Sequence, residues 1–257
     1  AGIVGAAIAS SVSEAVSLLF FFIYTSMTAD KRKYGFRRAF TLRPHLLKGM
    51  LSISGWPMVQ SFISVSIWFI FFLAIEHLGE RPLAVTNIVR NISALLIMVI
   101  SAFATTAGAL ISNQIGAGEQ RCLFKTCGMT LKLTYAILIP LLIILCLFPE
   151  PVLRAFTDSP SLIAASGNSV YVMASSTLIM APSFILFNAV SGTGNTKAGF
   201  IMEMISLAVY TAVIYYGIIR LKPDVALCWF SEHVYGVTLI ILAWWYLKSG
   251  KWRGKKV

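Results

Sequence analysis

Seven long, continuously apolar runs limit most strongly what this chain can fold into. They cover residues 3–26, 50–76, 83–112, 129–148, 164–190, 199–219 and 226–247. A helix needs about 20 mostly apolar residues to cross a bilayer, and only helices or closed barrels satisfy their backbone polar groups in lipid. The runs are too long and too continuous for barrel strands. We therefore predict an all-α integral membrane protein, a polytopic helical bundle of about seven transmembrane helices.

The composition agrees with lipid as the main solvent and partner. Of the 257 residues, 58% are hydrophobic and 12% are charged, whereas soluble domains contain about 25% charged residues. A soluble fold of this size cannot hide so much apolar surface. The net charge of +11 does not indicate a nucleic-acid partner, because the basic residues form short clusters between the apolar runs, as membrane-flanking charges do.

The Lys and Arg residues predict the orientation. If the seven helices alternate in direction, one side carries 15 of these residues outside the helices and the other carries four. The positive-inside rule then places the basic segments 27–49 and 248–257 in the cytoplasm, and with them the C-terminus. Residues 34–51 mix basic with aromatic and leucine side chains. They are either an amphipathic stretch on the anionic inner leaflet or a solvated linker.

Motifs for enzymatic chemistry and metal binding are missing from the sequence. The four cysteines have no metal-ligand spacing, and the three histidines are scattered with no catalytic motif around them. We therefore expect no catalytic residues, no metal and no cofactor apart from a coupling ion. A purely structural membrane subunit is the remaining alternative, and ionisable residues within the spans argue against it.

Ionisable groups inside a membrane are costly and are functional candidates by default. Among the ionisable residues within the spans we single out Glu14, Arg90, Glu203 and Glu232. At 1.5 Å per residue, Arg90 and Glu232 lie roughly 10 Å and 9 Å below the outer face, so we expect that they can pair. Glu203 should lie nearer the cytoplasm. Each group has either a role in handling ions or substrates, or a structural role in fixing helices.

These depths predict two polar layers. The outer layer contains Arg90, Asn87, Asn91, Glu232 and His233, and the inner layer contains Glu203, Asn113, Asn188 and Asn195. In the second run, Gln60 and its neighbours Ser61, Ser64 and Ser66 either line a pathway or, as we favour, join helices by hydrogen bonds. Pro57, Pro140 and Pro182 are candidates for helix kinks, which would suit a protein that opens alternately to each side.

Several motifs, taken in order, resemble the multidrug and toxic compound extrusion (MATE) family. Residues 87–91 and 110–118 are similar to its eighth helix and exit loop, and residues 187–196 to the end of the tenth. Residues 229–235, which include Tyr235, and 246–252 are similar to the twelfth helix and tail of bacterial members, and residues 2–9 to the start of the sixth. The resemblance covers essentially the whole chain.

The resemblance implies a twelve-helix transporter with two six-helix lobes. Residues 1–26 would be the last helix of the N-terminal lobe, 27–49 the interlobe loop, 50–247 the C-terminal lobe and 248–257 the tail. It implies a secondary active antiporter of the bacterial inner membrane that exports amphipathic, cationic drug-like compounds by alternating access, driven by Na⁺ or H⁺. The missing N-terminal lobe would be its partner.

Two departures from the family pattern concern the coupling ion. Some members carry a carboxylate on the seventh helix and an aspartate on the tenth, but the first region here is Ser64-Val65-Ser66 and residues 164–190 contain no acid. Coupling would then depend on the absent lobe, or on Glu203 and Glu232. A lipid-linked oligosaccharide flippase of the same superfamily is the alternative, and it would need a more cationic cavity than Arg90 alone provides.

Overall fold

The described part of the chain, residues 2–28 and 44–253 of a computed structural model, is helical and contains no strand. The chain divides into two compact units, Ala1–Met50 and Leu51–Val257. Helix α1, Gly2–Thr28, belongs to the first unit, and α2, Pro44–Glu76, runs across the division. Most of the predicted basic loop, including the greater part of the amphipathic stretch, lies outside the described residues.

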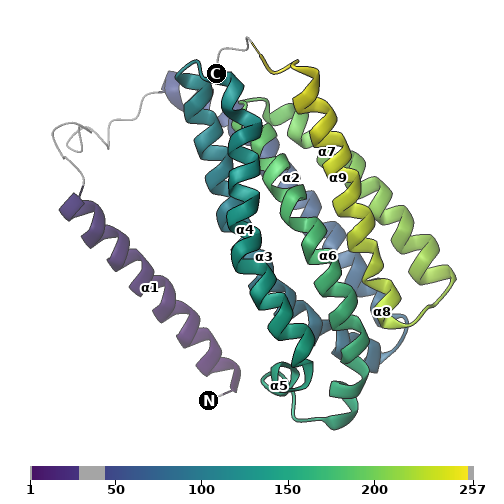
Figure 1. Cartoon of the computed structure of the whole chain (residues 1–257). Helices are drawn as coiled ribbons and strands as arrows, with labels where there is room; N and C mark the ends of the chain where they lie inside the picture. Colours follow the sequence, from purple (N-terminus) through teal and green to yellow (C-terminus); the bar gives the residue numbers. More distant parts are fainter. Residues whose placement is uncertain (1, 29–43, 254–257) are drawn as a thin grey trace. The chain divides into compact units, whose positions relative to one another are not determined.

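The remaining elements all belong to the second unit (Figure 1). They are α3 Glu80–Gly116, a 3₁₀ turn Gln120–Cys122, α4 Leu123–Leu147, α5 Pro149–Arg154, α6 Pro160–Gly192, α7 Thr196–Val213, a π-helical segment Ile214–Arg220, α8 Val225–Cys228 and α9 Phe230–Ser249.

The prediction of seven transmembrane helices is confirmed, because seven helices of the described chain are long and apolar enough to cross a membrane. The helices extend beyond the apolar runs. Helix α2 already begins at Pro44, and α3 continues to Gly116. The short helices α5 and α8 and the π-helical segment are not predicted by the apolar runs.

Helix α6 occupies the centre of the second unit and packs against α3, α4, α7 and α9 (Figure 1). Its approach to α3 is close because two glycines meet there. A Cβ added to Gly192 would lie 2.5 Å from the carbonyl oxygen of Gly108, and one added to Gly108 would lie 2.9 Å from that of Asn188. Small residues allow such close backbone packing between transmembrane helices.

Helix α2 joins the second unit mainly through side chains near its C-terminal end. Phe71 and Ile75 are fully buried in a cluster with Tyr210 and with residues of the π-helical segment. Residues 51–76 are the part of α2 that belongs to the second unit, and their backbone does not approach the other helices of that unit as closely as α3 approaches α6.

Proline is accommodated in the core helix α6 by a neighbouring helix. Pro182 has no N–H, so the carbonyl of Leu178 four residues earlier loses its helical partner. The hydroxyl of Tyr135 in α4 donates a hydrogen bond to that carbonyl oxygen at 2.7 Å. Pro57 and Pro140 also lie inside helices, α2 and α4, and the kinks proposed at the three prolines stay a prediction.

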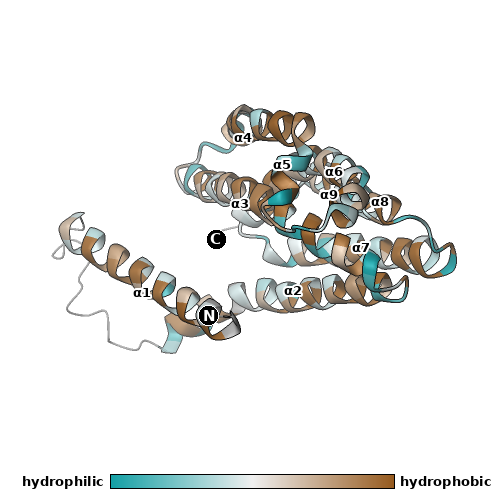
Figure 2. Ribbon diagram, turned by 90° about the horizontal axis from the view of Figure 1, so that it is seen from below, coloured by the Kyte–Doolittle hydropathy of each residue, from teal (hydrophilic) through white to brown (hydrophobic). Residues whose placement is uncertain are grey.

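The two ends of the second unit are distinguished by their connections. One end carries the turns at residues 117–119 and 193–195 and the end of α9, and we call it the C-terminal end. The opposite end carries the α2–α3 connection, α5 and the turn before α8. Seen from below, apolar residues dominate the helices and hydrophilic residues gather mainly in the connections (Figure 2).

Candidate functional site

A cavity of about 840 Å³ lies among α2, α3, α6, α7 and α9. A third of the 21 residues in its wall are aromatic, namely Trp68, Phe69, Phe72, Phe184, Phe187, Tyr210 and Tyr235. Three charged residues line it: Arg90, Glu203 and Glu232. A cavity of this size, apolar with a few polar groups, is typical of a small-molecule site. Its net charge is negative by one unit if all three side chains are ionised.

Glu203 lies in α7 and is only 4% exposed. Its Oε1 accepts hydrogen bonds from the Ser64 hydroxyl of α2 at 3.0 Å and from the Tyr235 hydroxyl of α9 at 2.8 Å. The carboxylate therefore connects three helices. Ser64 joins α2 to α7 by this hydrogen bond and also lines the cavity, so it fits both the helix-joining and the pathway interpretation of the polar residues in α2. Gln60 and Ser61 line the same cavity.

Glu232 lies in the first turn of α9 and is 8% exposed. Its Oε1 accepts a hydrogen bond from the Tyr210 hydroxyl of α7 at 2.9 Å. The rings of Tyr210 and Tyr235 meet edge to face, with centroids 5.9 Å apart. The hydrogen bonds between α7 and α9 are therefore reciprocal. Tyr235 of α9 donates to Glu203 of α7, and Tyr210 of α7 donates to Glu232 of α9.

This reciprocal arrangement is suited to binding a cation or a proton. Among the described residues, no basic side chain forms an ion pair with either carboxylate. A hydroxyl donates to an ionised carboxylate, but it can also accept from a protonated one or offer a lone pair to a cation. Occupancy of one carboxylate therefore affects a tyrosine on the helix that carries the other.

Arg90 does not pair with Glu232, so that prediction is wrong. Its guanidinium lies over the Phe72 ring, 5.1 Å from the centroid, and the described residues contain no ion pair between the two groups. Similar depth along the membrane normal does not determine where two residues lie around the bundle. Arg90 lies in α3 and Glu232 in α9, and α6 packs against both of these helices. Both side chains nevertheless line the same cavity.

The two predicted polar layers are partly merged. Asn188 and Glu203, assigned to the inner layer, line the same cavity as Arg90 and Glu232 from the outer layer. Asn87 and Asn91 do not line it, and the Asn87 amide donates to the Leu83 carbonyl of its own helix.

Two other members of the predicted layers have structural partners. Asn195 caps α7 and donates to the Tyr246 hydroxyl of α9. His233 shares a hydrogen bond with Ser175 of α6 and does not line the cavity.

Tyr210 is the main site residue that the sequence analysis missed. It lies in an apolar run, where an aromatic residue is most simply explained by packing. One signal was present: Tyr210 follows Glu203 by two helical turns, a spacing that places both side chains on one helix face.

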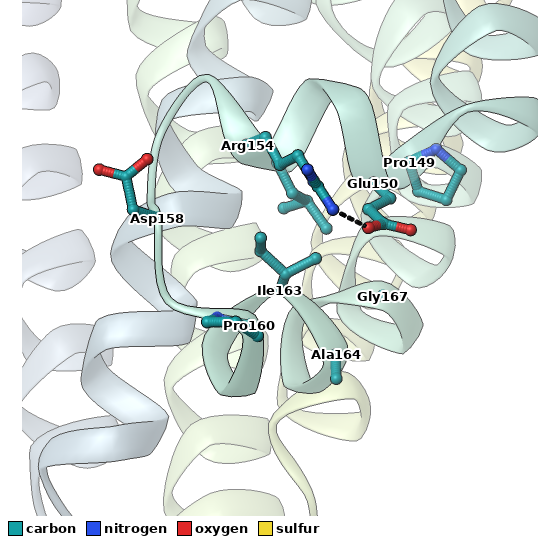
Figure 3. A pocket seen from close by; sticks show the side chains of 9 residues that line it. Pro149, Glu150, Arg154, Asp158, Pro160, Ile163, Ala164 and Gly167 are labelled. Atoms are coloured by element: carbon teal, nitrogen blue, oxygen red, sulfur yellow. Dashed lines mark hydrogen bonds and ion pairs between the residues drawn. The ribbon is translucent and has the colours of Figure 1, made fainter.

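A smaller pocket of about 480 Å³ lies at the opposite end of the second unit, between α5 and the start of α6 (Figure 3). Its charged groups are Glu150, Arg154 and Asp158. Glu150 and Arg154 form an exposed ion pair at 2.7 Å, while Asp158 points away from them (Figure 3). The pair is satisfied internally, and none of the predicted site residues lies here.

The fold and site define a class of protein: a polytopic α-helical membrane protein with a ligand-sized, carboxylate-bearing cavity between its helices. Comparison with known proteins is more specific. The family model described as MatE matches residues 57–216. The chain belongs to the MatE family.

Curated relatives agree with this membership. An uncharacterized transporter of Bacillus subtilis, YisQ, is 22% identical over 80% of the chain and 45% of its own length. A probable multidrug resistance protein of Thermotoga maritima, NorM, is 24% identical over 86% of the chain and 49% of its own length. The chain thus spans about half the length of the curated relatives it matches.

Solved structures share the fold. The Vibrio cholerae MATE transporter VcmN in its bent form superposes with a TM-score of 0.71 at 18% identity, covering 83% of this chain and 50% of that one. A multidrug resistance transporter of the MATE family in an outward-facing conformation gives a TM-score of 0.70 at 13% identity, covering 79% of this chain and 46% of that one.

Proposed function

We propose that this chain supplies one lobe of a cation-coupled exporter of drug-like organic compounds that works by alternating access. The observation that carries the proposal is the pair of buried carboxylates, Glu203 of α7 and Glu232 of α9, in a cavity with several aromatic side chains. Each carboxylate accepts a hydrogen bond from a tyrosine of the partner helix. Aromatic faces attract organic cations, and the net negative charge of the cavity favours the same ligands. A second, N-terminal lobe would complete the path for the substrate.

Coupling by H⁺ or Na⁺ would use Glu203 and Glu232. A coupling ion and a cationic substrate that compete for the same carboxylates cannot both occupy them, and this competition is the physical basis of exchange. The described spans carry no other acid in this cavity. The basic bias of the C-terminal end supports a cytoplasmic C-terminus in a bacterial inner membrane.

The flippase alternative receives less support from the cavity. A lipid-linked pyrophosphate would need several cations, and Arg90 is the one basic residue among the described residues that line it. Two carboxylates in the same wall oppose such an anion.

The test is ion-driven efflux of a fluorescent organic cation from proteoliposomes that contain the natural full-length protein. Glu203→Gln and Glu232→Gln should each reduce gradient-driven flux at least tenfold, which corresponds to about 1.4 kcal/mol, with folding intact. Glu150→Gln is the matched control, because it removes the charge of a carboxylate that lies outside this cavity. Wild-type flux in both Glu variants would overturn the assignment of coupling to this lobe.

A further inference from the structure

The chain ends its last helix in an ordered reversal, residues 249–253, which we call the C-terminal hook. Gly250 adopts a left-handed conformation with φ of 68° and turns the backbone away from the helix axis. Trp252 then folds back and is only 2% exposed, with its Nε1 donating to the Leu247 carbonyl at 2.9 Å. This buried indole fixes the hook against the end of α9.

The hook satisfies the end of α9 without using a cation. The Leu247 carbonyl accepts from Trp252, and the Tyr246 carbonyl accepts from the Ser249 hydroxyl at 2.7 Å. Lysine side chains often perform this capping role at helix C-termini. Because the indole and the hydroxyl perform it here, the ammonium groups of Lys248 and Lys251 are left for another partner.

The cations of the hook contact aromatic rings rather than carboxylates. The Lys251 Nζ lies 5.7 Å from the Trp245 ring centroid, and the Arg253 guanidinium lies 5.5 Å from that of Trp252. Within the described ranges, no carboxylate forms an ion pair with either. The C-terminal end of the second unit is strongly basic as a whole: its described charged residues are Arg121, Lys125, Lys197, Lys248, Lys251 and Arg253 against Glu119.

An exposed aromatic ledge lies next to these cations. Trp245 is 67% exposed and Trp244 is 49% exposed, one turn before the end of α9. The Trp244 ring packs edge to face on Phe124 of α4, with centroids 5.3 Å apart. Tryptophan at the end of a transmembrane helix lies at the level of lipid headgroups, so the ledge faces the glycerol and upper acyl region.

We propose that the C-terminal hook, the preceding Lys248 and the tryptophan ledge form a binding site for an anionic phospholipid of the leaflet at this end of the bundle. Lys248, Lys251 and Arg253 bind the phosphate and the anionic headgroup, and Trp244 and Trp245 contact the glycerol and acyl chains. A free anion would make no apolar contact with the tryptophan ledge, and an acidic peptide would have to displace lipid from it. An anionic phospholipid matches both parts.

The test measures retention of phosphatidylglycerol and phosphatidylcholine by the purified protein in native mass spectrometry. The variant Lys248→Gln/Lys251→Gln/Arg253→Gln removes the charges and leaves the buried Trp252 in place. Each basic residue near an anionic surface contributes about a fivefold change in binding, so phosphatidylglycerol retention should fall at least tenfold. Retention of phosphatidylcholine should fall much less, because the choline cation offsets the charge of its phosphate. Equal retention of phosphatidylglycerol by this variant and the wild type would overturn the proposal.

A matched control exists at the opposite end, where the Arg220 guanidinium lies 5.7 Å from the Tyr215 ring centroid. Arg220→Gln/Lys222→Gln should leave phosphatidylglycerol retention unchanged, and an equal fall in this variant would mean that only net charge matters, against a site at the hook.

Two further measurements test the ledge and the source of the phosphate. Trp245→Ala should weaken retention of both lipids without altering the charges, whereas unchanged retention would remove the ledge from the site. Inorganic phosphate at millimolar concentration should not displace phosphatidylglycerol. Displacement would show that the hook recognises a free phosphate instead of a phospholipid.

Discussion

At the scale of single residues, the carboxylates of the cavity depend on unequal numbers of hydrogen-bond donors. Glu203 has two donors, Ser64 and Tyr235, while Tyr210 is the one donor that the described residues give to Glu232. A buried acceptor that loses its only partner costs about 1–3 kcal/mol, and more when it is charged, whereas one that keeps a second donor costs less.

We therefore expect Tyr210→Phe to lower the free energy of unfolding by about 1–3 kcal/mol, and Ser64→Ala by less than about 1 kcal/mol. Phenylalanine keeps the ring packing of Tyr210 against Phe71, so the difference reports the hydroxyl. Thermal unfolding in detergent micelles measures both variants. Equal losses of unfolding free energy in Tyr210→Phe and Ser64→Ala would contradict this prediction. Adding Glu232→Gln to Tyr210→Phe should recover part of the loss, because it removes the unpaired charge.

The sequence identified the costly residues of the site but not their partners. Glu203 and Glu232 were singled out because charge inside an apolar run is rare, and that signal needs no tertiary structure. Arg90 was assigned to Glu232 from depth along the helix, yet its guanidinium lies over Phe72. Lateral position around the bundle depends on which helices are neighbours, and the hydrophobicity of the runs carries no such information.

At the scale of elements, the hydrogen bond from Tyr135 to Leu178 couples α4 to the proline of α6. Tyr135→Phe should lower the free energy of unfolding by about 1–2 kcal/mol, because the carbonyl freed by Pro182 loses its partner. In a Pro182→Ala background the new N–H can bond the same carbonyl, so Tyr135→Phe should then cost less than about 0.5 kcal/mol.

A double-mutant cycle of thermal unfolding measures this coupling. Tyr171→Phe is the matched control, because its hydroxyl lies 3.4 Å from the Cys146 carbonyl oxygen, a carbonyl that no proline frees. Its cost should be the same in both backgrounds. Additive effects of Tyr135→Phe and Pro182→Ala would mean that Tyr135 does not compensate for the proline.

The elements were predictable where length and composition decide them. Seven apolar runs gave seven helices because no other open structure satisfies its backbone in lipid. The π-helical segment Ile214–Arg220 was not predictable, because its residues continue the apolar run of α7 without a break. A change from α-helical to π-helical hydrogen bonding inside such a run leaves the hydrophobicity of the sequence unchanged.

At the scale of the whole molecule, the cavity is built by helices of the second unit, and the chain spans about half the length of its curated relatives. Binding of a ligand requires only the wall of a cavity, whereas alternating access requires two bodies that move against each other around it. Under the proposed function, ligand binding and transport should therefore separate in this chain.

We expect the chain alone, reconstituted in liposomes, to bind a fluorescent organic cation but to show no gradient-driven flux. Binding should weaken in the double variant Glu203→Gln/Glu232→Gln, because the cavity loses both negative charges, and this loss confirms that the dye occupies the cavity. The natural full-length protein in the same liposomes provides the control for flux. Gradient-driven flux by the chain alone would contradict the prediction, and it would place the complete transport path within these helices or within an assembly of two copies of them.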